Sequence, residues 1–173
     1  MRTIKTILLL LAAAATNVFA QSSPNFMVDE WQRAKIYTKE YLDAMPEGGY
    51  NFKPTPEVNT FAQQYVHLAA GNYRLASTAI NKPNPYPGGR ETEPKISSKE
   101  SVTKFVTDSY DYVIEGLKTL TETQLKENVT FGKLNPTREQ LFFKVFEHQT
   151  HHRGQTTIYL RLKGVVPPHE RLF

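Results

Sequence analysis

The sequence contains no cysteine, and this absence removes several kinds of chemistry. No disulfide can form, and the chain can hold neither a thiolate metal site nor a cysteine nucleophile. Any metal ion must therefore be bound by histidine, aspartate or glutamate side chains. A CxxCH motif is absent for the same reason, which counts against haem bound between helices.

Long runs of one charge sign are also lacking. The 21 Lys and Arg residues and 17 Asp and Glu residues are scattered, without a basic block interleaved with aromatic residues. This pattern argues against nucleic acid as the main partner. After the first 20 residues no stretch is apolar enough for a membrane helix. The 173 residues suffice for one domain with a core of its own.

The first 20 residues have the pattern of a secretory signal peptide. A short basic start, Arg2 and Lys5, precedes an apolar segment at 7–15 that is too short to span a bilayer comfortably. We expect cleavage after Ala20, which would release residues 21–173 to the periplasm or the medium and lower the net charge from +4 to +2. An uncleaved anchor is the alternative.

The remainder predicts an all-α protein. Apolar residues recur at spacings of three and four, with charged residues between them, and no convincing sheet pattern occurs. The pattern predicts a four-helix bundle with a long, proline-rich loop at 81–95 between the second and third helices. Such a loop allows a crossover connection, and it is either a lid over a site or a mobile connection. The four helices are expected at about 26–45, 56–81, 98–121 and 136–163.

Capping residues support these helix bounds. We expect Thr55 followed by Pro56 to begin the second helix. The pattern from Ser97 to Glu100 predicts a capping box at the third, and the segment 135–140 is a helix start for the fourth. Between them, 124–134 is expected to be a polar connection that is extended in part. Gly164 is expected as the C-terminal cap of the last helix, before Pro167 and Pro168 prevent its continuation.

One face of the fourth helix is apolar at both ends and polar in the middle, where it carries His148, His152 and Gln155. Burying such groups without partners costs about 1–3 kcal/mol each. Two histidines at i and i+4 point the same way and can share a divalent metal ion. The alternative is a pair of buried histidines bonded to neighbouring side chains, and the spacing alone does not decide between them.

The second helix carries His67, with Gln64 about a turn before it and Gly71 about a turn after. Gly71 would let a neighbouring chain or a ligand approach closely. Periodicity does not show whether His67 faces the core, and a lone helical histidine is more often structural than a ligand. Thr38 and Ser109 interrupt apolar stripes on the other two helices. They are either partners of the histidines or ordinary helical residues bonded back to a carbonyl.

The segment His148 to Gln155 resembles the HxxHHRGQ motif of the DinB-like (DinB/YfiT) superfamily of metal-binding four-helix bundles. The family name reflects damage-inducible genes and implies no DNA binding. The resemblance covers essentially the whole chain after the signal peptide. Three further stretches resemble family segments: Pro46–Pro56, His67–Tyr73 and Gly164–Pro168.

The resemblance implies a divalent metal ion, often zinc or nickel, held by His67, His148 and His152. His151 lies about 100° from His152 around the helix and is left outside this set. Arg153 is expected to be a salt-bridge partner at the bundle end or surface. Candidates for the pocket wall or for partners of the histidines are Thr38, Gln64, Ser109, Gln155 and Tyr159.

Relatives with this resemblance include S-transferases and an isomerase that use low-molecular-weight thiols. The first hypothesis is therefore a metal-dependent enzyme, a thiol transferase or a hydrolase. Export would remove the chain from the reducing thiol pool, which favours a second hypothesis, a non-catalytic exported protein that binds a metal or a small ligand. Glu147 lies off the histidine face, so no general base is assigned. The resemblance is also compatible with a homodimer, and neither hypothesis names a substrate.

Overall fold

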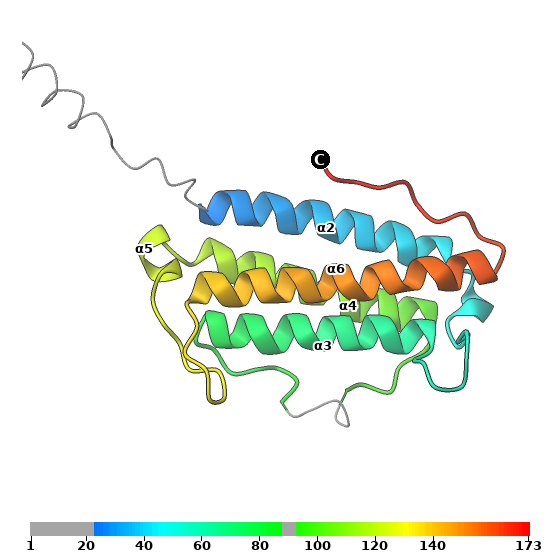
Figure 1. Cartoon of the computed structure of the whole chain (residues 1–173), viewed down its shortest axis with the longest axis horizontal. Helices are drawn as coiled ribbons and strands as arrows, with labels where there is room; N and C mark the ends of the chain where they lie inside the picture. The colour runs from blue at the N-terminus through cyan, green and yellow to red at the C-terminus, as the bar shows by residue number, and fades with distance from the viewer. Residues whose placement is uncertain (1–22, 88–92) are drawn as a thin grey trace, which may run out of the picture.

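A computed structural model describes residues 23–87 and 93–173. Within these ranges the protein is all-helical, and its longest helices form a four-helix bundle, as the sequence predicts (Figure 1). The predicted signal peptide lies outside the described residues. None of the described helices is long and apolar enough to cross a membrane. The elements are α2 (Pro24–Ala44), the 3-10 turn η1 (Glu47–Gly49), α3 (Phe61–Ala79), α4 (Lys99–Lys118), α5 (Glu122–Leu125) and α6 (Arg138–Leu162).

The order of the long helices around the bundle places α2 and α3 on opposite corners. Helix α3 packs against α4 and α6, and α2 packs against the same two helices. The colour gradient in Figure 1 shows that α3 and α4 run in the same direction, opposite to α2 and α6. Neighbouring parallel helices cannot be joined by a tight turn. The connection from α3 to α4 is therefore a crossover, which the long loop allows.

Aromatic side chains fill much of the core between α2, α4 and α6. Trp31 is 1% exposed, and its ring lies edge-on to Tyr110 and to Phe146, with centroids 5.4 Å apart in both pairs. Edge-to-face packing of this kind adds to the stability gained by burying the rings. The apolar positions on the predicted helix faces thus form one continuous core.

Helix α3 begins later than the sequence pattern predicts. Its N-cap is Thr60, whose hydroxyl accepts from the backbone N–H of Gln63 while the Gln63 side chain accepts from the Thr60 N–H. The backbone N–H of Phe61 also donates to the carbonyl of Phe52. These contacts fix the start at Phe61, so the expected start at Thr55 and Pro56 was wrong.

Two other expectations near helix ends also needed correction. Helix α4 is capped by Ser98, which accepts from the N–H of Ser101, so the capping box with Glu100 does not form. The short helix α5 was not predicted. The start of α6 agrees with the sequence pattern, since Thr137 caps it. At its end Lys163 is the C-cap, and Gly164 follows with φ of 72°.

Candidate metal centre

The facing sides of α3 and α6 bring three histidines together. On α6, His148 and His152 lie one turn apart, with ring centroids separated by 4.5 Å. His67 on α3 lies across from them, 5.2 Å from the His148 ring and 4.7 Å from the His152 ring. One nitrogen from each ring lies within 4.8 Å of the others, and all three residues are partly buried. His67 therefore faces the bundle interior, which periodicity alone did not decide.

Gly71 makes room for one of these rings. A Cβ added at Gly71 would lie 2.4 Å from Cε1 and 2.6 Å from Nδ1 of His148, well inside van der Waals contact. The absence of a side chain one turn after His67 is therefore what allows the His148 ring to lie against α3. This is the close approach that the glycine suggested from sequence.

The surroundings of His148 disfavour the charged form of its imidazole. Burial, together with nearby His67, Arg74 and His151, lowers the pKa of His148 to about 4. Its imidazole is therefore neutral near pH 7, the form that can bind a metal. Its Nδ1 is buried and has no hydrogen-bond partner among the described residues. A buried polar atom without a partner is costly, and such an atom in a histidine cluster fits a site that a ligand completes.

His152 is held in one tautomer by a chain of hydrogen bonds. The Asn59 carbonyl can only accept, so the Tyr159 hydroxyl donates to it, at 2.7 Å. That hydroxyl accepts a hydrogen bond from Gln64 Nε2 at 3.2 Å. The amide oxygen at the other end of Gln64, Oε1, therefore faces His152 and lies 2.8 Å from its Nδ1. Because an amide oxygen only accepts, Nδ1 of His152 carries the hydrogen. The lone pair of its neutral ring is therefore on Nε2.

His67 has an outer partner of a different kind. Its Nδ1 lies 2.5 Å from Oε1 of Glu93, a residue on the segment that leads into α4. The carboxylate accepts, so this nitrogen also carries a hydrogen. Local spacing gave no signal for Glu93, because it lies 26 residues from His67 and outside any helix.

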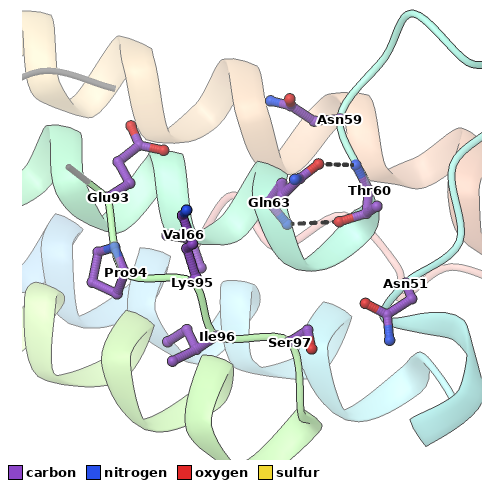
Figure 2. Close-up of a pocket in the computed structure, with 10 residues that line it drawn as sticks. All are labelled: Asn51, Asn59, Thr60, Gln63, Val66, Glu93, Pro94, Lys95, Ile96 and Ser97. Carbon is purple, nitrogen blue, oxygen red and sulfur yellow. Dashed lines mark hydrogen bonds between the residues drawn. The ribbon is translucent and has the colours of Figure 1, made fainter. Parts of the chain in front are cut away.

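A cavity of about 570 Å³ lies beside Glu93, and Figure 2 shows the residues that line it. Glu93, the partner of His67, forms part of its wall. Asn59 also lines it and is the last residue in the series of hydrogen bonds that orients His152. Thr60 and Gln63 also line it but are occupied with each other, as the dashed lines in Figure 2 show. This volume lies within the usual range for small-molecule pockets, roughly 300–1,000 Å³.

The other residues singled out from sequence lie in different places. Gln155 is exposed, and its Nε2 lies 3.0 Å from Nε2 of His151, which is exposed as well. Ser109 is buried, donates to the Val106 carbonyl and accepts from Asn72. Through these contacts neither Gln155 nor Ser109 is hydrogen-bonded to His67, His148 or His152.

Arg153 was expected at the bundle end or surface, and this expectation was wrong. The residue is only 7% exposed, and its guanidinium lies 4.4 Å from the centroid of the Tyr37 ring. Its Nη1 donates to Gln149 Oε1 at 2.9 Å and, over a longer distance of 3.4 Å, to Thr38 Oγ1. Thr38 therefore belongs to an interior cluster around Arg153 and not to the histidines.

The fold and the cluster define a class: helical bundles in which histidines from two facing helices form a site able to hold a metal ion. A sequence model of the DinB superfamily matches residues 30–156. The chain belongs to this superfamily, as the HxxHHRGQ segment indicated.

Individual relatives agree with this assignment. The Bacillus subtilis (strain 168) protein YjoA is 24% identical over 144 residues, covering 81% of this chain and 90% of YjoA. The crystal structure of a DinB-like protein from Bacillus cereus ATCC 10987 has a TM-score of 0.74 at 17% identity, over 87% of this chain and 99% of that one. The YjoA crystal structure has a TM-score of 0.65 at 18% identity, over 85% and 96%. At these identities the structures establish the shared fold alone.

Proposed function

We propose that His67, His148 and His152 hold one divalent metal ion. The observation that carries the proposal is the convergence of one nitrogen from each ring within 4.8 Å. The hydrogens on Nδ1 of His67 and His152 support it, because they place the lone pair of each neutral ring on Nε2, the nitrogen that would bind a metal. Neutral imidazole suits zinc and nickel, the metals we propose.

Three histidines leave coordination positions open, which is the pattern of catalytic sites rather than closed structural ones. A divalent ion bound here would supply Lewis acidity, which lowers the pKa of water or a thiol and polarises a carbonyl group. The protein's own part is positional: Gln64 and Tyr159 fix the ring of His152, and the cavity beside Glu93 admits a small molecule. We infer a metal-dependent transferase or hydrolase, with a low-molecular-weight thiol as a candidate cosubstrate.

The N-terminal pattern favours a second candidate. If the chain is exported after cleavage at Ala20, it works away from the reducing thiol pool. A non-catalytic exported protein that binds a metal or a small ligand then becomes the alternative. Turnover separates the two candidates, because an enzyme loses turnover in His148→Ala whereas a binder has none to lose. Mass analysis of the protein recovered from cells that express the full chain tests export, and a chain beginning at Gln21 is expected.

The first experiment is metal analysis of the protein purified without a histidine tag. We expect about one zinc or nickel ion per chain in the wild type, as a single three-histidine site requires. His67→Ala and His148→Ala should each lose it. His151→Ala is the matched control, because His151 is exposed on the same helix and should leave the metal content unchanged. A wild type that binds no metal after incubation with zinc or nickel would sink the proposal.

A further inference from the structure

The chain passes close to the histidine cluster where it returns from α3 toward α4. The described segment that precedes α4 carries Glu93, whose side chain is 16% exposed and meets that of His67, which is 25% exposed. Figure 2 shows Glu93 at one end of the row of residues lining the cavity. Burying part of a carboxylate costs free energy unless a hydrogen bond compensates for it, and the N–H of His67 supplies that bond.

We propose that Glu93 is a positioning residue of the metal centre: its carboxylate fixes the tautomer and the orientation of His67, so that Nε2 of His67 points at the ion. This inference rests on the proposed function. The bond from Nδ1 to Oε1, at 2.5 Å, requires the hydrogen on Nδ1. The neutral ring then has its lone pair on Nε2, the only nitrogen left for a metal.

Glu93 acts on the metal through His67 rather than as a ligand. The set of donor atoms that lie within 4.8 Å of one another comprises the three histidines and does not include Glu93. The carboxylate binds the far side of the His67 ring and is an outer partner. Its negative charge makes the imidazole a stronger electron-pair donor to a metal and partly offsets the charge of a divalent ion.

The two outer partners differ in strength. His152 is held by the neutral amide of Gln64 at 2.8 Å, whereas His67 is held by a carboxylate at 2.5 Å. Hydrogen bonds to ionised acceptors are shorter and about twice as strong as neutral ones. Because Glu93 also lines the cavity, a molecule bound there lies next to the group that orients His67. The crossover segment therefore contributes directly to the site that the helices build.

Three variants test this role. Glu93→Ala removes the acceptor, and Glu93→Gln keeps an oxygen but removes the charge. Glu57→Ala is the matched control, because it removes an exposed glutamate from another loop. Zinc affinity is measured by competition with a chromophoric chelator. We expect Glu93→Ala to bind zinc about 10–100-fold more weakly, Glu93→Gln to fall between it and wild type, and Glu57→Ala to match wild type.

Two spectroscopic readouts separate positioning from ligation and from folding. The cobalt(II) complex of Glu93→Gln should keep the visible band intensities of the wild type, because the ligand set is unchanged. In the metal-free protein, ¹⁵N NMR should show His67 with its hydrogen on Nδ1 in wild type and a mixture of tautomers in Glu93→Ala.

Each outcome bears on one claim. Wild-type zinc affinity in Glu93→Ala, or the same His67 tautomer in both proteins, would overturn the positioning role and leave the metal site intact. Changed cobalt band intensities in Glu93→Gln would make Glu93 a ligand and overturn it as well. If the wild type itself binds no zinc, the proposed function fails and the inference fails with it.

Discussion

Two polar clusters lie inside this bundle, and both depend on neighbouring residues of α6. His152 turns toward α3 and joins the histidine cluster, while Arg153 turns toward α2 and joins Thr38. Adjacent helical residues differ by about 100° in direction, so one helix serves both clusters. Their hydrogen-bond patterns differ in a way that separates structural polar groups from a binding site.

The Arg153 cluster closes on itself. Arg153 donates to Gln149 Oε1 and to Thr38, and Tyr110 donates to the same Gln149 oxygen at 2.8 Å. Thr38 and Tyr110 share a further bond of 2.7 Å, which completes a ring of four side chains. Burial raises the pKa of Tyr110 to about 12, so its hydroxyl keeps its hydrogen near pH 7. All four residues are at most 7% exposed.

The histidine cluster is open by contrast. Its histidines have outer partners in Glu93 and Gln64, but Nδ1 of His148 has no partner among the described residues. Glu93, the outer partner of His67, lines a cavity of about 570 Å³. A closed polar network rigidifies a core, whereas an incomplete one beside a cavity is suited to a ligand. Variants that affect one cluster and spare the other test this distinction.

The largest expected effect separates stability from metal binding. Arg153→Ala should lower the free energy of unfolding of the metal-free protein by about 3 kcal/mol, because it removes charge-assisted hydrogen bonds, a cation–π contact and packing. Zinc stoichiometry should stay at the wild-type value. His148→Ala should show the opposite result, with metal binding lost and the metal-free stability lowered by only about 1 kcal/mol. Urea unfolding with a chelator present measures the metal-free stability of each variant, and metal analysis measures its zinc content. Equal loss of zinc in the two variants would contradict the division.

A smaller effect is expected from two glycines in helices. In Gly71→Ala the new Cβ would lie 2.4 Å from His148 Cε1, so the ring must move and zinc affinity should fall at least tenfold, or about 1.4 kcal/mol. Gly154→Ala is the control, since no atom lies within 4 Å of the Cβ it would add. It should stabilise α6 by up to about 1 kcal/mol and leave zinc affinity unchanged. Chelator competition and thermal unfolding report the two quantities, and unchanged affinity in Gly71→Ala would mean that the His148 ring is not confined there.

The sequence predicted most of the fold and one part of the site well. The spacing of His148 and His152 indicated a shared face. Of the candidate partners, Gln64 is bonded to His152, and Tyr159 is bonded to Gln64. His67 needed the family resemblance, because its helix is apolar on more than one face. The face shared by His148 and His152 is a local feature, and helical periodicity records it.

The errors arise where tertiary packing decides. Arg153 was misplaced because α6 packs on both α2 and α3 and so buries two faces, whereas its apolar stripe marks only one of them. Glu93 was missed because a crossover segment brings it to His67, and no short-range pattern records that path. The start of α3 was misjudged because a backbone bond from Phe61 to the Phe52 carbonyl, together with the capping box of Thr60, fixes it, and the pattern around Thr55 does not record that bond.

The smallest expected effect tests the hydrogen-bond chain behind His152. Tyr159→Phe removes the hydroxyl that accepts a hydrogen bond from Gln64 Nε2 and donates one to the backbone carbonyl of Asn59. The Gln64 amide then loses the contact that sets which of its two ends faces His152. Zinc affinity should fall about tenfold, at the lower end of the range for outer partners of a metal-binding histidine.

The control for this variant is Tyr65→Phe, which removes a buried hydroxyl bonded to Thr156 at 2.9 Å, away from the histidines. Each variant should lower the free energy of unfolding of the metal-free protein by about 1 kcal/mol for each hydrogen bond lost, which is one bond in Tyr65→Phe and two in Tyr159→Phe. Only Tyr159→Phe should also weaken zinc binding. Equal zinc affinities in the two variants would show that the Tyr159 hydroxyl stabilises the fold without orienting His152.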